Sequence, residues 1–269
     1  MIDLPLSRSD RTALEVATQA AEEAGNLLLE QAHGKRQLTS KNGRANFVTD
    51  VDVLVEKRII SLLQSEYPDY NILTEEANAI DKGSEYTWVI DPLDGTNNYI
   101  HGIPFYSVSI ALTSREDILL GTIYDPWMKE LFRAEKGAGA WLNDHRIAVS
   151  DQKSLSDAFI GSDMGYDAEA GKRFLAAVRN SWPQMFGLRI MGSAVLGLAY
   201  VACGRLGIYV HSCLYPWDIA SGILLVREAG GLATDWDGNP STLQNSQVVA
   251  GNSTLHKEFM ELLNAKFRP

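Results

Sequence analysis

Residues 88–97 read WVIDPLDGTN and join a short apolar run to two acids that lie three residues apart. The apolar residues 88–90 are typical of the end of a buried strand. Pro92 fixes its own φ and disfavours a helical conformation at Asp91, so the chain must turn there. We therefore expect the turn to bring the carboxylates of Asp91 and Asp94 together at the end of a sheet.

Gly95 and Thr96 follow the second acid and offer backbone N–H groups, a hydroxyl and little steric bulk. Such groups can bind an anion, and two carboxylates beside them can ligate a divalent cation. The alternative interpretation is a strand-to-helix corner with an aspartate N-cap, which either acid alone would favour. A proline, a glycine and two acids at one buried strand exit favour a site for a cation and a phosphate group.

Three segments of the chain are similar to motifs of one known family. Residues 88–97 resemble the first signature of the inositol monophosphatase family of Mg²⁺-dependent phosphomonoesterases. WDIASG at residues 217–222, followed by EAGG at 228–231, resembles a second signature. A third element, TEE, lies upstream at residues 74–76. The order and spacing of the three fit the family, and the resemblance covers residues 12–260.

The composition is that of an ordinary globular enzyme, with 45% hydrophobic and 22% charged residues among 269. The formal charge of −10 argues against nucleic acid backbones or anionic membranes as principal partners. Cys203 and Cys213 lack the spacing of a metal site, and we expect both to be buried. Residues 1–11 have no apolar core of signal-peptide length, and no run reaches membrane-spanning length, so we expect a soluble, cytoplasmic protein.

The first half of the chain, residues 1–145, is expected to form two helices laid over a largely antiparallel sheet. Apolar residues at spacings of three or four predict one helix over residues 12–32 and another from Val51 to just before Pro68. A polar, glycine-containing loop is expected between them at residues 39–46. Strands are predicted at residues 71–74, 87–90, 106–112, 118–124 and 131–134.

The second half, residues 146–269, is expected to alternate strands with helices. Such alternation suggests a layered α/β sandwich. The family resemblance makes this more specific, because it implies an α-β-α-β-α sandwich with the site between two halves that pack as one catalytic unit. Helices are predicted at residues 168–180, 193–203, 216–229 and 252–267, and strands at 158–161, 188–190, 206–210, 232–234 and 248–250.

Four acids, Glu75, Asp91, Asp94 and Asp218, stand at predicted strand ends or at a helix start. Placed together without a cation, they would repel one another and raise their own pKa values. Bound metal ions therefore explain the cluster better than a purely structural role of the four acids does. The resemblance implies two or three Mg²⁺ ions, and Mn²⁺ accepts the same oxygen ligands. It assigns one metal to Glu75, Asp91 and the backbone carbonyl of Leu93. A second metal is assigned to Asp91, Asp94 and Asp218.

The resemblance also implies which residues are catalytic. Thr96 and Asp52 would orient and deprotonate the attacking water, and Glu75 would act beside them. An alternative for Asp52 is an acid in the first turn of the second helix, stabilised by the helix dipole, and both interpretations can hold. Phosphate would rest on the N–H groups of Gly95 and Thr96, and no residue needs to become phosphorylated.

The same resemblance assigns substrate contacts to Asp94, Gly95, Thr96, Ala194, His211 and Asp218. Ala194 belongs to residues 192–194, which on their own are simply a helix start with a serine cap. Enzymes that prefer inositol phosphates have a glutamate seven residues before Asp218, where this chain has His211, a group that can donate or accept. The position three before that aspartate, often histidine in the animal enzymes, is Tyr215.

These residues predict Mg²⁺-dependent hydrolysis of a small phosphate monoester by a metal-activated water, with inositol monophosphate as the leading substrate. Histidinol phosphate, fructose 1,6-bisphosphate and 3′-phosphoadenosine 5′-phosphate are alternatives within the same chemistry. A non-catalytic metal- and anion-binding regulatory protein is the alternative from another class, and the complete set of acids argues against it. The resemblance further implies inhibition by Li⁺ and a homodimer, and the charge of −10 favours neither a nucleic acid polymer nor a membrane as partner.

Overall fold

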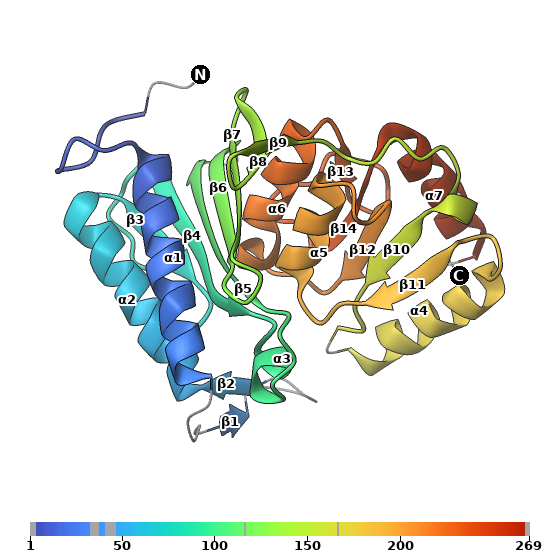
Figure 1. Ribbon diagram of the computed structural model, residues 1–269, viewed down its shortest axis with the longest axis horizontal. Helices are drawn as coiled ribbons and strands as arrows, with labels where there is room; N and C mark the ends of the chain where they lie inside the picture. Colours follow the sequence, from blue (N-terminus) through green and yellow to red (C-terminus); the bar gives the residue numbers. More distant parts are fainter. Residues whose placement is uncertain (1–3, 33–37, 41–46, 116, 166, 267–269) are drawn as a thin grey trace.

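A computed structural model describes residues 4–32, 38–40, 47–115, 117–165 and 167–266. Its helices and sheets alternate in five layers (Figure 1). One helix pair covers the outer face of a seven-stranded sheet, a second pair lies between the two sheets, and a third covers the outer face of a five-stranded sheet. The predicted α-β-α-β-α sandwich is confirmed. In that order, the pairs are α1 (Ala13–Gln31) with α2 (Asp50–Glu66), α5 (Ala194–Ala202) with α6 (Pro216–Glu228), and α4 (Ala168–Ser181) with α7 (Ser253–Lys266).

The seven-stranded sheet follows chain order from β3 to β9. Its neighbouring strands are antiparallel except for β3 and β4, which are parallel. The prediction of a largely antiparallel sheet is therefore correct, although β8 and β9 were not predicted. The strands are β3 (Asn71–Thr74), β4 (Tyr86–Asp94), β5 (Ser107–Ser114), β6 (Asp117–Asp125), β7 (Glu130–Glu135), β8 (Gly139–Leu142) and β9 (His145–Ile147).

The five-stranded sheet has the order β11-β10-β12-β14-β13. Strand β10 is parallel to both β11 and β12, so the carboxyl ends of these three strands lie at one edge of the sheet. That edge faces α3 (Thr96–Ile100), the short helix that follows β4 (Figure 1). The strands are β10 (Phe159–Ser162), β11 (Gly187–Ile190), β12 (Ile208–Ser212), β13 (Leu232–Thr234) and β14 (Gln247–Gly251).

The smaller elements adjust several predicted boundaries. Strands β1 (Leu38–Ser40) and β2 (Phe47–Thr49) form a two-stranded sheet, so the start of the predicted loop is a strand. Residues 41–46 of that loop lie outside the described residues, as does residue 267, where the last helix was predicted to end. A short 3-10 helix, Leu155–Asp157, precedes β10.

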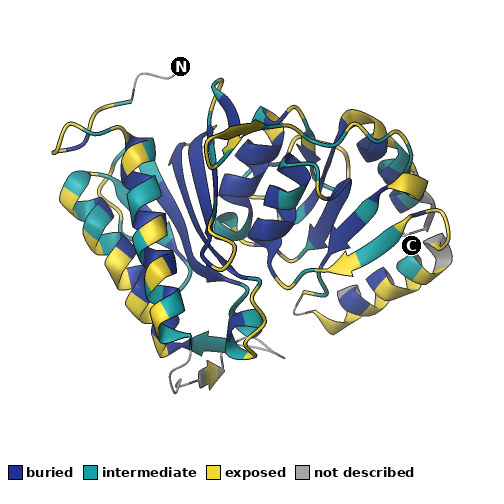
Figure 2. Ribbon diagram, in the orientation of Figure 1, coloured by how far each residue is buried: buried dark blue, intermediate teal, exposed yellow. Residues whose placement is uncertain are grey.

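Helix α6 packs directly on the seven-stranded sheet, and this contact fixes where its first residues lie. The hydroxyls of Ser109 on β5 and Ser221 on α6 are hydrogen-bonded at 2.9 Å in the buried interior. A Cβ added at Gly121 on β6 would come within 2.8 Å of the Ser221 Cα, closer than real contacts allow. Figure 2 shows α5, α6 and both flanking sheets as largely buried, which makes this the core of the molecule.

The structure corrects the expectation about the two cysteines. Cys213 is exposed and Cys203 is half-buried, so the prediction that both would be buried is wrong. Cys213 has a left-handed φ of 64°, which places it in a turn after β12 rather than in the core. Among the described residues, no helix is both long and apolar enough to cross a membrane.

Candidate active site

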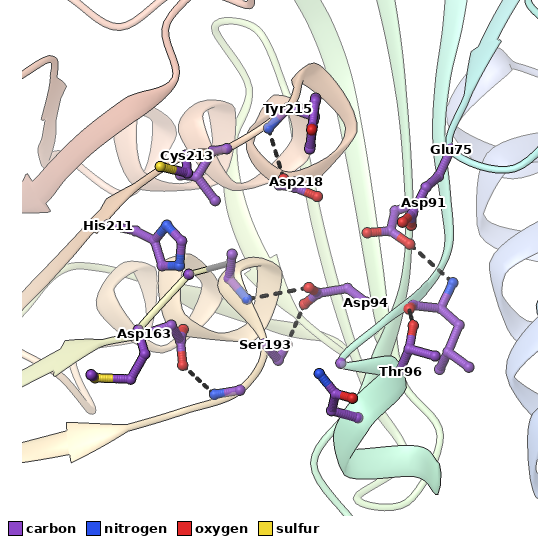
Figure 3. Close-up of a pocket in the computed structure, with 18 of the residues that line it drawn as sticks. Glu75, Asp91, Asp94, Thr96, Asp163, Ser193, His211, Cys213, Tyr215 and Asp218 are labelled. Atoms are coloured by element: carbon purple, nitrogen blue, oxygen red, sulfur yellow. Dashed lines mark hydrogen bonds between the residues drawn. The ribbon is translucent and has the colours of Figure 1, made fainter. Parts of the chain in front are cut away.

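A pocket of about 310 Å³ opens between the two halves of the molecule (Figure 3). Nine of the ten residues predicted for the site line it, and the tenth, Asp52, touches one of the nine. Five of the lining residues are acids, whereas none of the described lining residues is lysine or arginine. The nine predicted residues are Glu75, Asp91, Leu93, Asp94, Gly95, Thr96, Ala194, His211 and Asp218.

Asp91 and Asp94 reach the pocket together because β4 is irregular at this point. The strand was predicted to end at residue 90, but it continues to Asp94 with a register shift between Asp91 and Asp94. Asp91 pairs with Ser109 and Asp94 with Ser107, so three steps on β4 match two on β5. Residues three apart on a regular strand would point to opposite faces. The bulge therefore places both acids on the pocket side.

The turn after Asp94 requires a glycine. Gly95 has φ 92° and ψ 34°, a left-handed conformation that other residues rarely adopt. A Cβ there would lie 3.0 Å from the Phe105 carbonyl oxygen and 3.1 Å from that of Gly192. Helix α3 starts at the next residue, Thr96, whose hydroxyl lies 3.0 Å from the Leu93 carbonyl oxygen and 3.3 Å from Asp52 Oδ1.

Asp52 lies in the first turn of α2, as the second interpretation predicted, and it also faces Thr96. Its Oδ2 accepts hydrogen bonds from the backbone N–H of Thr49, at 2.9 Å, and from the Thr49 hydroxyl, in a capping box at the start of α2. Its Oδ1 faces the hydroxyl of Thr96. Burial raises the pKa of Asp52, and the charge of Glu75 adds to that effect. The side chain is thus both a helix cap and a partner of the predicted catalytic threonine.

Asp94 joins the two halves of the molecule. Its carboxylate accepts hydrogen bonds from the Ser193 hydroxyl and from the backbone N–H groups of Ala194, at 3.2 Å, and Val195, at 3.0 Å. These donors form the N-terminus of α5, where Ser193 is also the N-cap and accepts from Leu196 at 3.2 Å. Burial raises the pKa of Asp94 to about 7 despite the three donors. The predicted serine cap is therefore confirmed and is part of the pocket.

The acids of the pocket act on one another electrostatically. Burial raises the pKa of Asp91 well above its usual value, and the charges of Glu75, Asp94 and Asp218 raise it further. Asp218 Oδ2 also accepts a hydrogen bond from the backbone N–H of Tyr215 at 2.7 Å. As the side chains stand, no group of three or more His, Cys, Asp or Glu among the described residues is arranged to hold a metal ion.

Asp163 is a fifth acid in the pocket and was not predicted. It follows β10 directly, and its carboxylate accepts hydrogen bonds from the Tyr209 hydroxyl, at 2.6 Å, and from the backbone N–H of Gly192. Burial raises its pKa to about 6. The sequence signal that could have identified it is an acid two residues beyond the predicted strand 158–161, at the same edge as the end of β12.

His211 lies at the end of β12 in the same wall of the pocket (Figure 3). Only 7% of the residue is exposed, and burial lowers its pKa to about 4, so the imidazole is neutral at physiological pH. Its Nδ1 has no hydrogen-bond partner among the described residues. Tyr215, 53% exposed, lies at the mouth of the pocket and stacks on Trp217, with ring centroids 5.1 Å apart.

Several solved structures are similar to this one along nearly the whole chain. The extragenic suppressor protein suhB from Bartonella henselae has a TM-score of 0.89 and 39% identity, covering 93% of this chain and 97% of that one. The inositol monophosphatase from Thermotoga maritima has a TM-score of 0.86 at 32% identity, covering 94% and 96%. A structure titled IMPase/NADP phosphatase complexed with Mg²⁺ and phosphate has a TM-score of 0.79 at 25% identity, covering 90% and 91%. The class of protein that these similarities define is a phosphoric monoester hydrolase.

The chain belongs to the inositol monophosphatase family, whose profile matches residues 9–269. Inositol-1-monophosphatase from Mesorhizobium japonicum is 40% identical over 251 residues, which cover 92% of this chain and 94% of that protein. Nus factor SuhB from Pasteurella multocida is 38% identical over 250 residues, with the same coverage of 92% and 94%. The predicted family and enzyme class are therefore confirmed.

Proposed function

We propose that the protein hydrolyses a small phosphate monoester in a Mg²⁺-dependent reaction and that inositol monophosphate is the leading candidate substrate. The observation that carries the proposal is a pocket with five acids and no lysine or arginine among its described lining residues. A phosphate group could not enter such a pocket unless cations offset the negative charge. Family membership and the Mg²⁺ and phosphate named for a relative at 25% identity support the same conclusion.

The donor set fits Mg²⁺, which prefers carboxylate and carbonyl oxygens. Glu75, Asp91, Asp94, Asp218 and the carbonyl of Leu93 would hold two or three ions. Burial and, after it, the charges of Glu75, Asp94 and Asp218 raise the pKa of Asp91, and bound cations would offset that repulsion. When bound, Mg²⁺ supplies positive charge that orients the phosphate oxygens and stabilises charge developing in the transition state.

Thr96 and Asp52 are the proposed catalytic pair. The Thr96 hydroxyl lies within hydrogen-bond reach of Asp52 Oδ1, so a water beside Thr96 could pass its proton to that carboxylate. Burial raises the pKa of Asp52 and makes it a better proton acceptor than an exposed aspartate. Glu75 lies near enough for its charge to strengthen this effect.

The leaving alcohol would lie against the wall formed by the ends of β10 and β12. His211 and Asp163 offer a neutral imidazole and a carboxylate to substrate hydroxyls, and Ala194, whose N–H donates to Asp94, lines the pocket beside them. A neutral histidine in place of an acid keeps histidinol phosphate, fructose 1,6-bisphosphate and 3′-phosphoadenosine 5′-phosphate as alternative substrates. We extend the proposal to Li⁺ inhibition and a homodimer, which the family resemblance implies. We also extend it to a cytoplasmic location with no nucleic acid polymer or membrane as partner, which the composition and the charge of −10 favour.

The test is phosphate release by the purified protein, with and without Mg²⁺, from inositol 1-phosphate and the three alternative substrates. Metal-dependent release from at least one is expected, and the highest kcat/KM identifies the substrate class. Release that does not depend on metal would contradict the mechanism. Mg²⁺ binding without release from any substrate would favour a non-catalytic regulatory protein, the other class considered from the sequence.

A further inference from the structure

Helix α2 carries two acids on the face that it buries against the seven-stranded sheet. The buried residues of the helix include Val55 and Ile59, which belong to the apolar core under the sheet. Asp52 and Glu56 lie on the same face, one helical turn apart, and are only 0% and 2% exposed. A buried carboxylate is costly unless donors satisfy it, so each acid must have specific partners.

The partners of Glu56 lie in the segment that carries Glu75. Glu56 Oε1 accepts hydrogen bonds from the Thr74 hydroxyl, from the backbone N–H of Glu76 at 2.9 Å and from that of Ala77 at 3.2 Å. Strand β3 ends at Thr74, so the last two donors lie beyond the sheet pairing of that strand. The three donors surround Glu75 on both sides in the sequence and converge on one oxygen atom.

Besides its capping partner Thr49, Asp52 has a partner in the other ligand-bearing segment of this half. Asp52 Oδ1 faces the Thr96 hydroxyl, which is also within 3.0 Å of the Leu93 carbonyl oxygen. One face of α2 therefore contacts both segments that supply the proposed ligands of the first metal. Strand β3 ends opposite Ile90 of the parallel strand β4, which continues to Asp94, and α2 packs against β4.

We propose that Glu56 is a positioning residue, whose carboxylate holds residues 74–77 so that Glu75 meets Asp91 and the Leu93 carbonyl in the pocket. The proposal rests on the proposed function, in which Glu75 ligates a metal. Hydrogen bonds to an ionised acceptor are about twice as strong as neutral ones, and a rigid helix supplies the acceptor at a fixed place. Partners that orient metal ligands typically change metal affinity or activity by about 10–100-fold when they are mutated.

The test compares Glu56→Gln with Glu66→Gln, a matched change on the same helix. Glu66 also accepts three kinds of hydrogen bond, from the Ser9 N–H at 3.2 Å, the Ser9 hydroxyl at 2.7 Å and Arg11 at 2.8 Å, but none involves the pocket. Calorimetry measures Mg²⁺ affinity, and hydrogen exchange of the metal-free protein measures protection of the Glu76 and Ala77 amides. We expect Glu56→Gln to weaken Mg²⁺ binding about tenfold and to speed exchange at those amides, with Glu66→Gln unchanged.

Glu75→Gln separates failure of this inference from failure of the proposed function. If Glu75→Gln weakens Mg²⁺ binding while Glu56→Gln leaves both affinity and exchange at the wild-type values, Glu56 does not position the ligand. If Glu75→Gln itself leaves Mg²⁺ affinity unchanged, Glu75 is not a ligand and the proposed function fails with it. If Glu56→Gln does not fold, Thr74→Val removes one of the three donors at similar volume, and wild-type affinity and exchange in that variant would overturn the inference.

Discussion

The hydroxyl of Ser193 donates a hydrogen bond to the carboxylate of Asp94, which lies 99 residues earlier in the chain. Two backbone N–H groups of α5 donate to the same carboxylate. The N-terminus of a helix in the second half of the chain therefore contacts an acid in the first half. The favourable charge of a helix N-terminus stabilises the ionised form of Asp94, whereas burial opposes it. Several measurable properties should depend on this junction.

Asp94→Asn should abolish turnover and leave the fold intact, because the change removes a negative charge at nearly constant volume. We expect kcat/KM with Mg²⁺ to fall by at least about a hundredfold. The matched control is Asp117→Asn, since Asp117 is an exposed acid paired with Lys136 at 3.0 Å on the surface. Circular dichroism should match the wild type in both variants. Near-normal activity in Asp94→Asn would rule out the assignment of this acid to the metal site.

Ser193→Ala should lower both the free energy of unfolding and the affinity for Mg²⁺. Loss of the cap to Leu196 costs about 1 kcal/mol, and Asp94 loses one of its three donors. Urea unfolding and calorimetry measure the two effects. Thr12→Ala is the control, because Thr12 caps α1 through a capping box far from the pocket. That variant should lose similar stability and bind Mg²⁺ normally, and a Ser193→Ala protein that behaves the same way would show that the junction is only structural.

The metal-free protein should become less stable as the pH rises from 5 to 8. Burial raises the pKa of Asp94 to about 7 and those of Asp163 and Asp125 to about 6, from an ordinary value of 3.8. The folded protein then holds these protons more tightly than the unfolded chain. Their stabilising contribution is complete below the unfolded pKa and is lost as the pH rises through 6 and 7. Thermal unfolding in a chelator measures this trend, and added Mg²⁺ should stabilise the protein more at pH 8 than at pH 5.

Two histidines oppose this loss of stability over part of the pH range. Burial lowers the pKa of His211 to about 4 and also lowers that of His256, so both oppose the trend as the pH falls below 6.5.

Asp125 lies outside the pocket, and its Oδ2 has no hydrogen-bond partner among the described residues. Asp125→Asn should therefore flatten the pH dependence of stability without changing the effect of Mg²⁺. A metal-free protein whose stability rises steadily from pH 5 to 8 would contradict these assignments.

His211→Glu should shift substrate preference toward inositol phosphates if the imidazole contacts the leaving alcohol. A glutamate accepts hydrogen bonds from neighbouring hydroxyls, whereas a neutral imidazole offers one donor and one acceptor. His211→Gln is the matched variant, since it keeps a neutral side chain with both functions. Relative kcat/KM values across the four candidate substrates measure the shift. The same ranking in all three proteins would place His211 outside the substrate contacts.

The sequence predicted most of the site because its residues sit in local motifs. The segment from Asp91 to Thr96 contains its own turn chemistry, and the start of α6 presents Asp218 through its own first turn. Asp163 was missed because its role depends on which strands become neighbours, and two parallel pairings in the second sheet place it there. A sequence pattern alone does not specify that strand order.

Three further differences between prediction and structure have the same kind of cause. Strand β4 was predicted to end before Asp91, because a proline and an acid usually end a strand, but pairing with β5 carries the strand through a bulge. Glu56 was not singled out, because an acid inside a helix is usually solvated, and only the approach of residues 74–77 makes it a buried acceptor. Cys213 was expected to be buried, but a left-handed turn places it on the surface.

The close contact between Gly121 and Ser221 fixes the position of α6 and, with it, one wall of the pocket. The opposite wall can vary. No side chain can be added at Gly121 without displacing α6, so the register between α6 and the first sheet has almost no freedom to drift. The acids on that side must keep their spacing as the protein evolves. The opposite wall, at the ends of β10, β11 and β12, consists of chain turns that can change length and composition. New substrates would therefore be acquired by changing that wall, while the hydrolytic chemistry is inherited unchanged.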